Sequence, residues 1–308
     1  MLKELVKSIK DDEFVKFRLS MGFKFALIPT IALVSSVVMN YILLRVTLSV
    51  LASFESGKNY IVEDVIFIFA EKGIVTVLMY SGVVFVCLFV LGMFVANVTL
   101  RPFKVIGEYC ESSLESDELS YDPDFLSELK LLSSFSEWFF SVMLMARETK
   151  IIKGISIPSK YKRIHKPVFE TSFFIQNFLI IIITTLATGF LIHIGTEEVY
   201  TGVIEVIREA YPSKGTINAF LVELNEISWQ ISNFCILINA LLYFLFSIYL
   251  YSKISTPAFG IFATMRSFVS GKYSSRVHLI GFPYVRKYTR MVNKYLDHLE
   301  KEYTSKDN

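Results

Sequence analysis

The chain has 308 residues, of which 53% are hydrophobic and 15% aromatic, and its mean hydropathy is +0.49. Soluble domains rarely reach such values, and the formal net charge of +2 gives no reason to expect a nucleic-acid partner. The apolar residues are also clustered along the chain, so the composition indicates an integral membrane protein.

Four stretches lack any charged residue and are long enough to cross a bilayer, which takes about 20 helical residues. They are Phe25–Leu44, Gly73–Leu100, Thr171–Ile192 and Ile227–Ser252. Helices are expected because a span must satisfy its own backbone hydrogen bonds, and the alternation typical of barrel strands is absent. The first stretch begins after 24 residues of charged sequence and no small-residue cleavage site follows it, so we interpret it as a retained anchor.

Lysine and arginine are concentrated in three segments that flank these spans. Residues 1–24 hold six, residues 147–166 hold seven, and the tail after Ser252 holds ten, whereas the loops 51–72 and 193–226 hold two each. Basic flanks remain on the cytoplasmic side of a membrane. Both termini and the middle segment are therefore predicted to be cytoplasmic, and the two loops external.

The chain repeats one plan with an offset of about 155 residues, the distance from Pro102 to Pro257. After each proline, and again in a second helix of each half, positions recur at spacings of three and four residues. Such stripes are typical of helices that pack in a bundle. In the first half the stripe positions are Phe103, Ile106, Cys110 and Ser113, then Leu132, Phe135, Phe139, Val142 and Ala146. In the second half they are Ala258, Ile261, Met265 and Phe268, then Val285, Tyr288, Val292, Tyr295 and Leu299.

The predicted fold class is an all-α integral membrane protein with four transmembrane helices in two tandem repeats, each followed by a cytoplasmic amphipathic helix pair. The expected division is an N-terminal segment (1–24), a first span pair with its loop (25–100), a first helix pair (101–147), a basic linker (148–170), a second span pair with its loop (171–252), a second helix pair (253–300) and a tail (301–308).

The segment from Ser255 to about Glu300 resembles a HAMP linker, a parallel helix pair that joins membrane spans to cytoplasmic output modules. Pro257 just past a span, Gly271 in an extended connector and Asn293 inside the second helix carry this resemblance. The segment departs from the family at the start of the second helix, where Pro283 and Tyr284 stand in the region of the usual acidic residue.

The first copy, about Arg101 to Arg147, is a more degenerate match to the same family. It keeps Pro102, has no connector glycine, and has Trp138 where Asn293 aligns. A HAMP-like unit supplies two helices of a four-helix bundle, which normally requires two chains. Two units in one chain therefore imply an intrachain pseudo-dimer, with a homodimer as the alternative.

The charges of the two connector regions favour pairing between the two copies. Glu111–Asp124 holds six acidic residues and no basic one, whereas the region from Lys272 to Arg290 holds five basic residues and no acidic one. Like-with-like pairing would place equal charges together, and such patterns select partners. The sequence thus favours contact between the first and the second helix pair.

No catalytic motif is present: the sequence has no P-loop, GxGxxG, GxSxG, kinase or cyclase signature, and its four histidines share no metal-ligand spacing. We therefore expect no enzymatic activity, no cofactor and no metal.

The expected function is a membrane signal relay or regulatory subunit that acts through the HAMP-like bundle on a separate protein, such as a signalling enzyme, a receptor or an envelope machine. Membrane lipids are the other expected partner, and the resemblance together with the topology implies a bacterial cytoplasmic (inner) membrane. Two alternatives remain open: a structural accessory subunit of an envelope complex, and a small transporter or channel built from two parallel repeats.

Overall fold

The computed structural model describes residues 12–54, 59–115, 121–122, 129–149, 155–167, 170–210 and 215–304. Within these ranges every regular element is helical, which confirms the all-α class. Four helical segments are long and apolar enough to cross a membrane, and each contains one of the four expected spans. They are Glu13–Val50, Ile66–Ser112, Thr171–Glu209 and Ala219–Val269.

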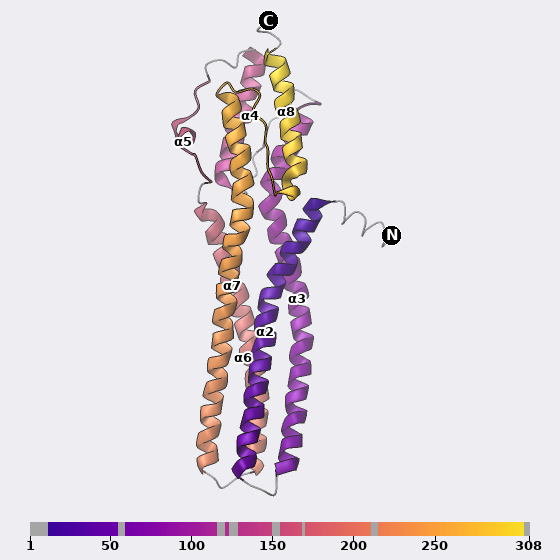
Figure 1. The fold of residues 1–308 in the computed structure, drawn as a ribbon, viewed down its shortest axis with the longest axis vertical. Helices are drawn as coiled ribbons and strands as arrows, with labels where there is room; N and C mark the ends of the chain where they lie inside the picture. The colour runs from indigo at the N-terminus through magenta and orange to yellow at the C-terminus, as the bar shows by residue number, and fades with distance from the viewer. Residues whose placement is uncertain are drawn as a thin grey trace, which may run out of the picture. The chain divides into compact units, whose positions relative to one another are not determined.

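The elements follow one another as long helices with short amphipathic ones between and after them (Figure 1). In chain order they are α2 (Glu13–Phe54), α3 (Asn59–Ser112), α4 (Lys130–Thr149), α5 (Ser159–Lys162), α6 (Thr171–Ala210), α7 (Gly215–Val269), the 3₁₀ turn η1 (Pro283–Val285) and α8 (Arg286–Thr304). Asp12 starts α2, because its carboxylate Oδ1 accepts the backbone N–H of Phe14 at 2.9 Å and satisfies a donor that the first turn leaves free.

The long helices extend further than the uncharged stretches suggested. We expected loops at 51–72 and 193–226, but both are helical apart from 55–58 and 211–214, which lie outside the described residues. The physical reason is a shared apolar cluster in which Ile66, Val203 and Ile207 are fully buried. One apolar face is enough to keep a helix packed even when charges occupy the other face.

The two prolines that follow predicted spans, Pro102 and Pro257, do not end the helices that contain them. Helix α3 continues through Pro102 and α7 through Pro257. A proline inside a helix removes one hydrogen bond to the carbonyl four residues earlier. In α7 that carbonyl belongs to Lys253, and the hydroxyl of Tyr284 donates to it at 2.5 Å. A side chain from beyond the end of α7 thus replaces the missing backbone donor.

The chain divides into two compact units, and each long helix contributes a segment to both. Unit 1 comprises Met1–Met21, Met93–Gln176 and Ser247–Asn308. Unit 2 comprises Gly22–Gly92 and Asn177–Phe246. Unit 1 therefore holds α4, α5, α8 and the adjoining ends of the long helices, whereas unit 2 holds the remainder of α2, α3, α6 and α7.

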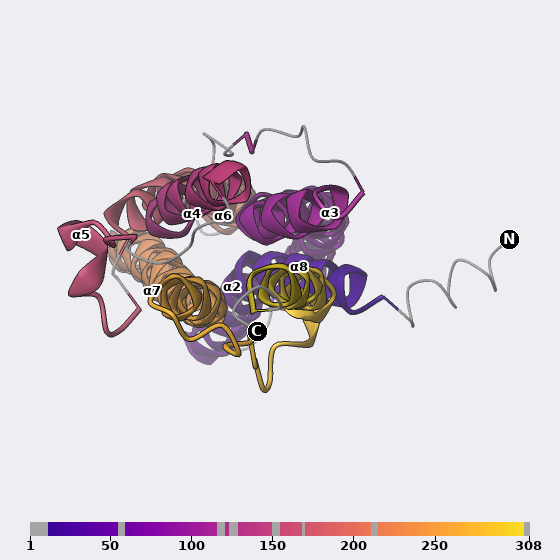
Figure 2. The same cartoon turned by 90° about the horizontal axis from the view of Figure 1, so that it is seen from above.

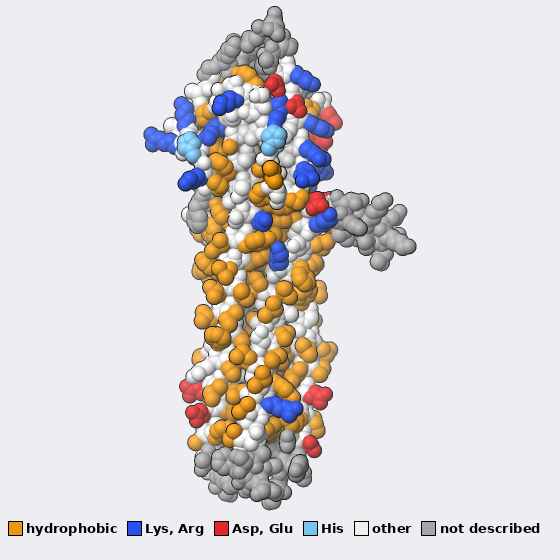
Figure 3. Space-filling view, viewed as in Figure 1, with side chains coloured by type: hydrophobic (Ala, Val, Ile, Leu, Met, Phe, Trp, Pro, Cys, Tyr) orange, Lys and Arg blue, Asp and Glu red, His pale blue; other side chains and the backbone are white. Residues whose placement is uncertain are grey.

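The surface of unit 2 exposes large apolar side chains. Met79 is 71% exposed, Leu186 68% and Leu237 66%. Hydrophobic side chains crowd the visible face of these helices (Figure 3). An apolar surface of this extent is typical of contact with lipid rather than water.

Neutral polar side chains link the helices inside unit 2. The Ser228 hydroxyl donates to Asn40 Oδ1 at 2.6 Å and joins α7 to α2. Asn239 Nδ2 donates to Thr185 Oγ1 at 3.5 Å and joins α7 to α6. Interhelical hydrogen bonds of this kind stabilise helix contacts where water is scarce.

Gly92 provides a test of the contact between α2 and α3. A Cβ added there would lie 2.6 Å from Phe25 Cβ and 3.0 Å from Gly22 Cα, neither of which can swing away. Gly92→Ala is expected to destabilise the protein by about 1–3 kcal/mol, seen as a lower unfolding temperature by circular dichroism in detergent. Gly82→Ala is the matched control, because its Cβ would meet no atom within 4 Å. Equal unfolding temperatures for the two variants would contradict this helix contact.

Candidate functional site: the short-helix bundle of unit 1

The expected stripe positions form the interior of unit 1. Every stripe residue is buried except Val142, which is half-buried, and both prolines are buried as well. Phe103, Ile106, Cys110, Phe135, Phe139, Ile261, Met265, Phe268, Val285, Val292 and Leu299 are all 0% exposed, while Leu132 and Ala258 are 2% and 7% exposed. The core of unit 1 is thus supplied by the ends of α3 and α7 together with α4 and α8.

Helix α4 contacts each of the other three helices through aromatic rings. The ring centroids of Phe135 and Phe262 of α7 are 4.6 Å apart, and Phe140 lies 5.8 Å from Tyr295 of α8 and 4.4 Å from Tyr109 of α3. The end-on view shows the four helices side by side (Figure 2). Edge-to-face and tilted pairs of this kind contribute beyond simple burial.

Helices α3 and α8 approach each other at Gly107. A Cβ added to Gly107 would lie 3.0 Å from the Cβ of Tyr288, so only glycine permits this spacing. The first turns of α2 cover the same place, because Phe14 meets the Tyr288 ring edge-on at 6.0 Å and Phe17 stacks on Tyr284 at 4.1 Å. The start of α8 is therefore enclosed by α2 and α3.

The connector between α7 and α8 (residues 270–282) begins with a glycine turn. Gly271 has φ +97°, a left-handed conformation that other residues rarely adopt. Its N–H donates to the Phe268 carbonyl at 3.0 Å, and the N–H of Lys272 donates to the Ser267 carbonyl at 3.1 Å. These two bonds make a Schellman motif, which satisfies the last carbonyls of α7 and ends the helix.

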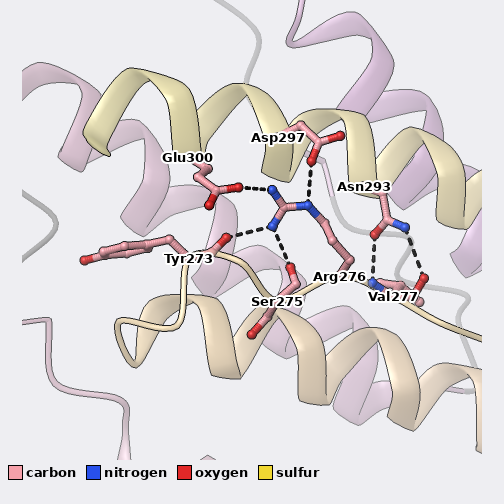
Figure 4. Close-up of polar contacts among 7 residues, drawn as sticks. All are labelled: Tyr273, Ser275, Arg276, Val277, Asn293, Asp297 and Glu300. Atoms are coloured by element: carbon pink, nitrogen blue, oxygen red, sulfur yellow. Dashed lines mark hydrogen bonds and ion pairs between the residues drawn. The ribbon is translucent and has the colours of Figure 1, made fainter. Parts of the chain in front are cut away.

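Asn293 binds the backbone of the connector with both ends of its side-chain amide (Figure 4). Its Oδ1 accepts the N–H of Val277 at 2.8 Å, and its Nδ2 donates to the Val277 carbonyl at 3.0 Å. Val277 is 4% exposed, so neither backbone group could turn to water instead. This pair fixes the register of the connector against α8.

Arg276, the preceding residue, reinforces that attachment. Its Nε donates to Asp297 Oδ1 at 2.6 Å and its Nη2 pairs with Glu300, both on α8. Its Nη1 donates to the Tyr273 carbonyl at 2.7 Å. Together with Asn293, the two acidic residues are spaced four and three residues apart along one face of α8 (Figure 4).

The first helix pair is held differently. Trp138, which matches Asn293 by the offset of 155 residues between the two prolines, contacts Phe135 at 5.4 Å between ring centroids and Tyr161 at 6.2 Å. Most of the acidic connector Glu111–Asp124 lies outside the described residues, so the expected charge pairing between connectors remains a prediction. An ion pair between the two helix pairs does join Arg147 of α4 to Glu302 of α8 at 3.8 Å.

Sequence reasoning missed the docking of α5 onto the bundle. Tyr161 is 3% exposed and meets the Phe135 ring edge-on at 4.9 Å. Arg266 of α7 donates from Nη1 to the carbonyls of Tyr161 at 3.1 Å and Ile164 at 2.5 Å. The only signal in the sequence is one tyrosine between two lysines in a basic linker, and no periodicity marks it.

Glu170 was missed as well, although it joins three helices. Its carboxylate accepts the N–H of Leu131 in the first turn of α4 at 2.9 Å, while its own N–H donates to the hydroxyl of Tyr251 in α7 at 3.0 Å. It also precedes α6. Burial raises the pKa of the Glu170 carboxyl, and the Leu131 N–H and the charge of Lys130 only partly offset this.

Among the described residues, no three His, Cys, Asp or Glu side chains gather to hold a metal ion. No protein-family model, curated protein or solved structure matches the chain. The class follows from the part of the chain that the structure describes: it is all-helical, with four helices long and apolar enough to span a membrane.

The substitution Asn293→Ala would leave the N–H and the carbonyl of Val277 buried without hydrogen-bond partners. Each unpaired group should lower the free energy of unfolding by about 1–3 kcal/mol. We expect a lower unfolding temperature and faster hydrogen exchange of the Val277 amide. Lys294→Ala, at the exposed neighbouring position of α8, is the control and should change neither quantity. Unchanged exchange at Val277 in Asn293→Ala would contradict the assigned pairing.

Glu170 predicts a pH dependence of stability. Because its pKa is raised from the usual 4.5, its contribution is fully present below pH 4.5 and is lost as the pH rises through the raised value. Glu170→Gln keeps the acceptor for Leu131 without the charge, so its unfolding temperature should rise relative to that of the wild type as the pH is raised from 4.5.

Glu137→Gln removes a carboxylate from the exposed face of α4 and serves as the control for this comparison. Glu170→Ala, which removes the acceptor altogether, should be less stable than Glu170→Gln at every pH. A difference between the wild type and Glu170→Gln that stays constant with pH would refute the assignment.

Proposed function

We propose that the protein is a non-enzymatic signal relay or regulatory subunit of a membrane, and that it acts through a HAMP-like bundle in unit 1 on a separate protein. The observation that carries this proposal is the burial of the stripes of α3, α4, α7 and α8 in one core. The contacts of Phe135 with Phe262 and of Phe140 with Tyr295 join the first helix pair to the second within one chain. These contacts support an intrachain pseudo-dimer.

The continuity of α3 and α7 supports a relay. Each helix contributes apolar residues to unit 2 and stripe residues to unit 1 without interruption at its proline. A rotation or shift of either helix would therefore change which side chains meet in the core of unit 1. Packed cores respond to such shifts by moving between discrete arrangements.

The outer face of α8 offers a surface for the partner protein. Arg286, Lys287, Arg290 and Lys294 are all exposed on this helix. Charges of one sign on one face favour a partner with the opposite sign. We propose that the partner presents an acidic surface to α8, and that the host membrane is a bacterial cytoplasmic membrane with both termini on the cytoplasmic side.

A static accessory subunit of an envelope complex is the second candidate. The hydrogen bonds of Asn293 with Val277 and the ion pairs of Arg276 favour it, because they fix the second helix pair in one arrangement. A relay differs in requiring a second packing of the same core when the partner or a signal is bound.

The pseudo-dimer can be tested with one engineered cross-link. Arg147→Cys on α4 and Glu302→Cys on α8 replace an ion pair whose Nε and Oε2 atoms lie 3.8 Å apart, so a short thiol-reactive cross-linker should join the two cysteines in a background whose native cysteines are replaced by alanine. The expected product is a cross-link within one chain, visible as a faster-migrating monomer on a denaturing gel. Covalent dimers without a cross-linked monomer would exclude the intrachain bundle.

The partner can be sought by mild purification of the full chain and mass spectrometry of what is retained. A stoichiometric protein should be kept by the wild type and lost from Lys287→Glu/Arg290→Glu. The control variant Lys162→Glu/Arg163→Glu should keep this partner protein. It makes the same charge change on exposed residues of α5 and of the turn after α5. A homo-oligomeric ring without a partner would instead support a transporter or channel.

A further inference from the structure

A cavity of about 350 Å³ lies between α3 and α6 within unit 2. Val77 and Val84 of α3, Leu191 and Ile194 of α6, and Leu33 of α2 give it an apolar wall. Binding pockets for small molecules have volumes of about 300–1,000 Å³ and are mostly apolar, with a few polar groups that orient the ligand. The cavity is therefore large enough to hold part of a ligand.

Two close contacts show how the cavity runs along the helices. A Cβ added to Gly195 of α6 would lie 3.3 Å from Val77 Cγ2 of α3, and a Cβ added to Gly73 of α3 would clash with Val199 Cγ2 of α6. Residue numbers thus rise along α3 as they fall along α6, so the two helices are antiparallel beside the cavity. Gly73 lies level with Val199, and Val77 lies level with Gly195.

The cavity has an apolar end and a polar end. At the apolar end, Val84 and Leu191 pack against the buried cluster that contains Leu33. At the other end, near Gly73, lies Glu198, which is exposed and is the one charged side chain among the described residues that line the cavity. Glu198 follows the uncharged run of α6, just as the uncharged run of α3 begins at Gly73. The polar end is therefore at the level of the lipid headgroups.

The side of the cavity is open to lipid. Two of its lining residues, Tyr80 and Ile194, are 62% and 46% exposed on the apolar surface of unit 2. At 1.5 Å per residue, the stretch of α3 from Gly73 to Val84 is about 16 Å long, which is close to the depth of about 15 Å of hydrocarbon in one leaflet. An acyl chain whose headgroup lies near Glu198 would therefore extend along the whole cavity.

The carboxylate of Glu198 indicates which headgroup fits. A carboxylate accepts hydrogen bonds and attracts cations, so it favours an ammonium group with N–H donors. Phosphatidylethanolamine carries such a group, whereas the quaternary ammonium of phosphatidylcholine has no N–H donor.

We propose that the cavity binds phosphatidylethanolamine, with an acyl chain along Val77, Val84 and Leu191 and the headgroup ammonium at Glu198. The site is independent of the relay, because it requires only that α3 and α6 lie in a membrane.

The first test is lipid binding to the full chain in an uncharged detergent, measured by native mass spectrometry. Phosphatidylethanolamine and phosphatidylcholine with the same acyl chains are titrated separately. The wild type should bind phosphatidylethanolamine about three- to fivefold more tightly, as expected of one exposed charge pair. Glu198→Ala should lose this preference. Glu197→Ala is the matched control and should keep it, because Glu197 is also exposed but does not line the cavity.

The second test concerns the acyl chain. Val84→Phe fills the cavity and should weaken the binding of both lipids at least fivefold. Val83→Phe, at a 62% exposed position outside the cavity, should leave it unchanged. Soluble phosphoethanolamine, the headgroup without chains, should compete only weakly. Should Val84→Phe fail to fold, the exposed Glu198→Ala variant still decides.

Four results would overturn the proposal. They are equal binding of the two lipids by the wild type, equal effects of Glu197→Ala and Glu198→Ala, undiminished binding by a folded Val84→Phe variant, and competition by phosphoethanolamine as strong as that of the lipid. The last result would show a site for a soluble amine instead.

Discussion

One hydrogen bond determines how the second half of unit 1 is held together. Pro257 deprives the Lys253 carbonyl of its helical donor, and the hydroxyl of Tyr284 supplies a replacement. Burial, and after it the neighbouring Tyr249, raises the pKa of Tyr284, so the hydroxyl keeps the proton that it donates. Because Tyr284 lies in η1, the turn that leads into α8, and stacks on Phe17, this bond sets where α8 begins against α7 and α2.

Local patterns in the sequence predicted where the long apolar helices lie and which face of each short helix is buried. The uncharged stretches predicted the four spanning helices, and the three- and four-residue spacing identified the positions that are buried in unit 1. The contacts that align the helices could not be predicted in this way. Tyr284 acts on a residue 31 positions away, Arg266 on one 105 positions away, and Glu170 on one 81 positions away. No periodicity encodes partners at such separations, and charged outer faces likewise hid the helical character of residues 193–210.

Apolar stripes and polar contacts have different consequences for the bundle. Burial of a stripe is non-directional, so it specifies the alignment of two helices less strictly than a hydrogen bond does. The amide of Asn293 can bond both backbone groups of Val277 in only one alignment of the connector with α8. Arg276 pairs with two carboxylates of α8 in the same alignment. The second helix pair is therefore specified by directional contacts. In the first pair, Phe140 follows the stripe residue Phe139 as Asn293 follows Val292, and it makes aromatic contacts instead.

For the relay that we propose, this asymmetry locates the part that moves. The connector and α8 are fixed to each other by directional bonds, and Tyr284 joins α8 to α7, so these elements would move as one body. Helix α4 meets that body through the rings of Phe135 and Phe140, and ring contacts fix an alignment less strictly than the hydrogen bonds of the connector do. Its first turn, however, is held by Glu170. A change in packing would therefore pivot α4 about this end, and the displacement would be largest near Arg147, where α4 reaches Glu302 of α8.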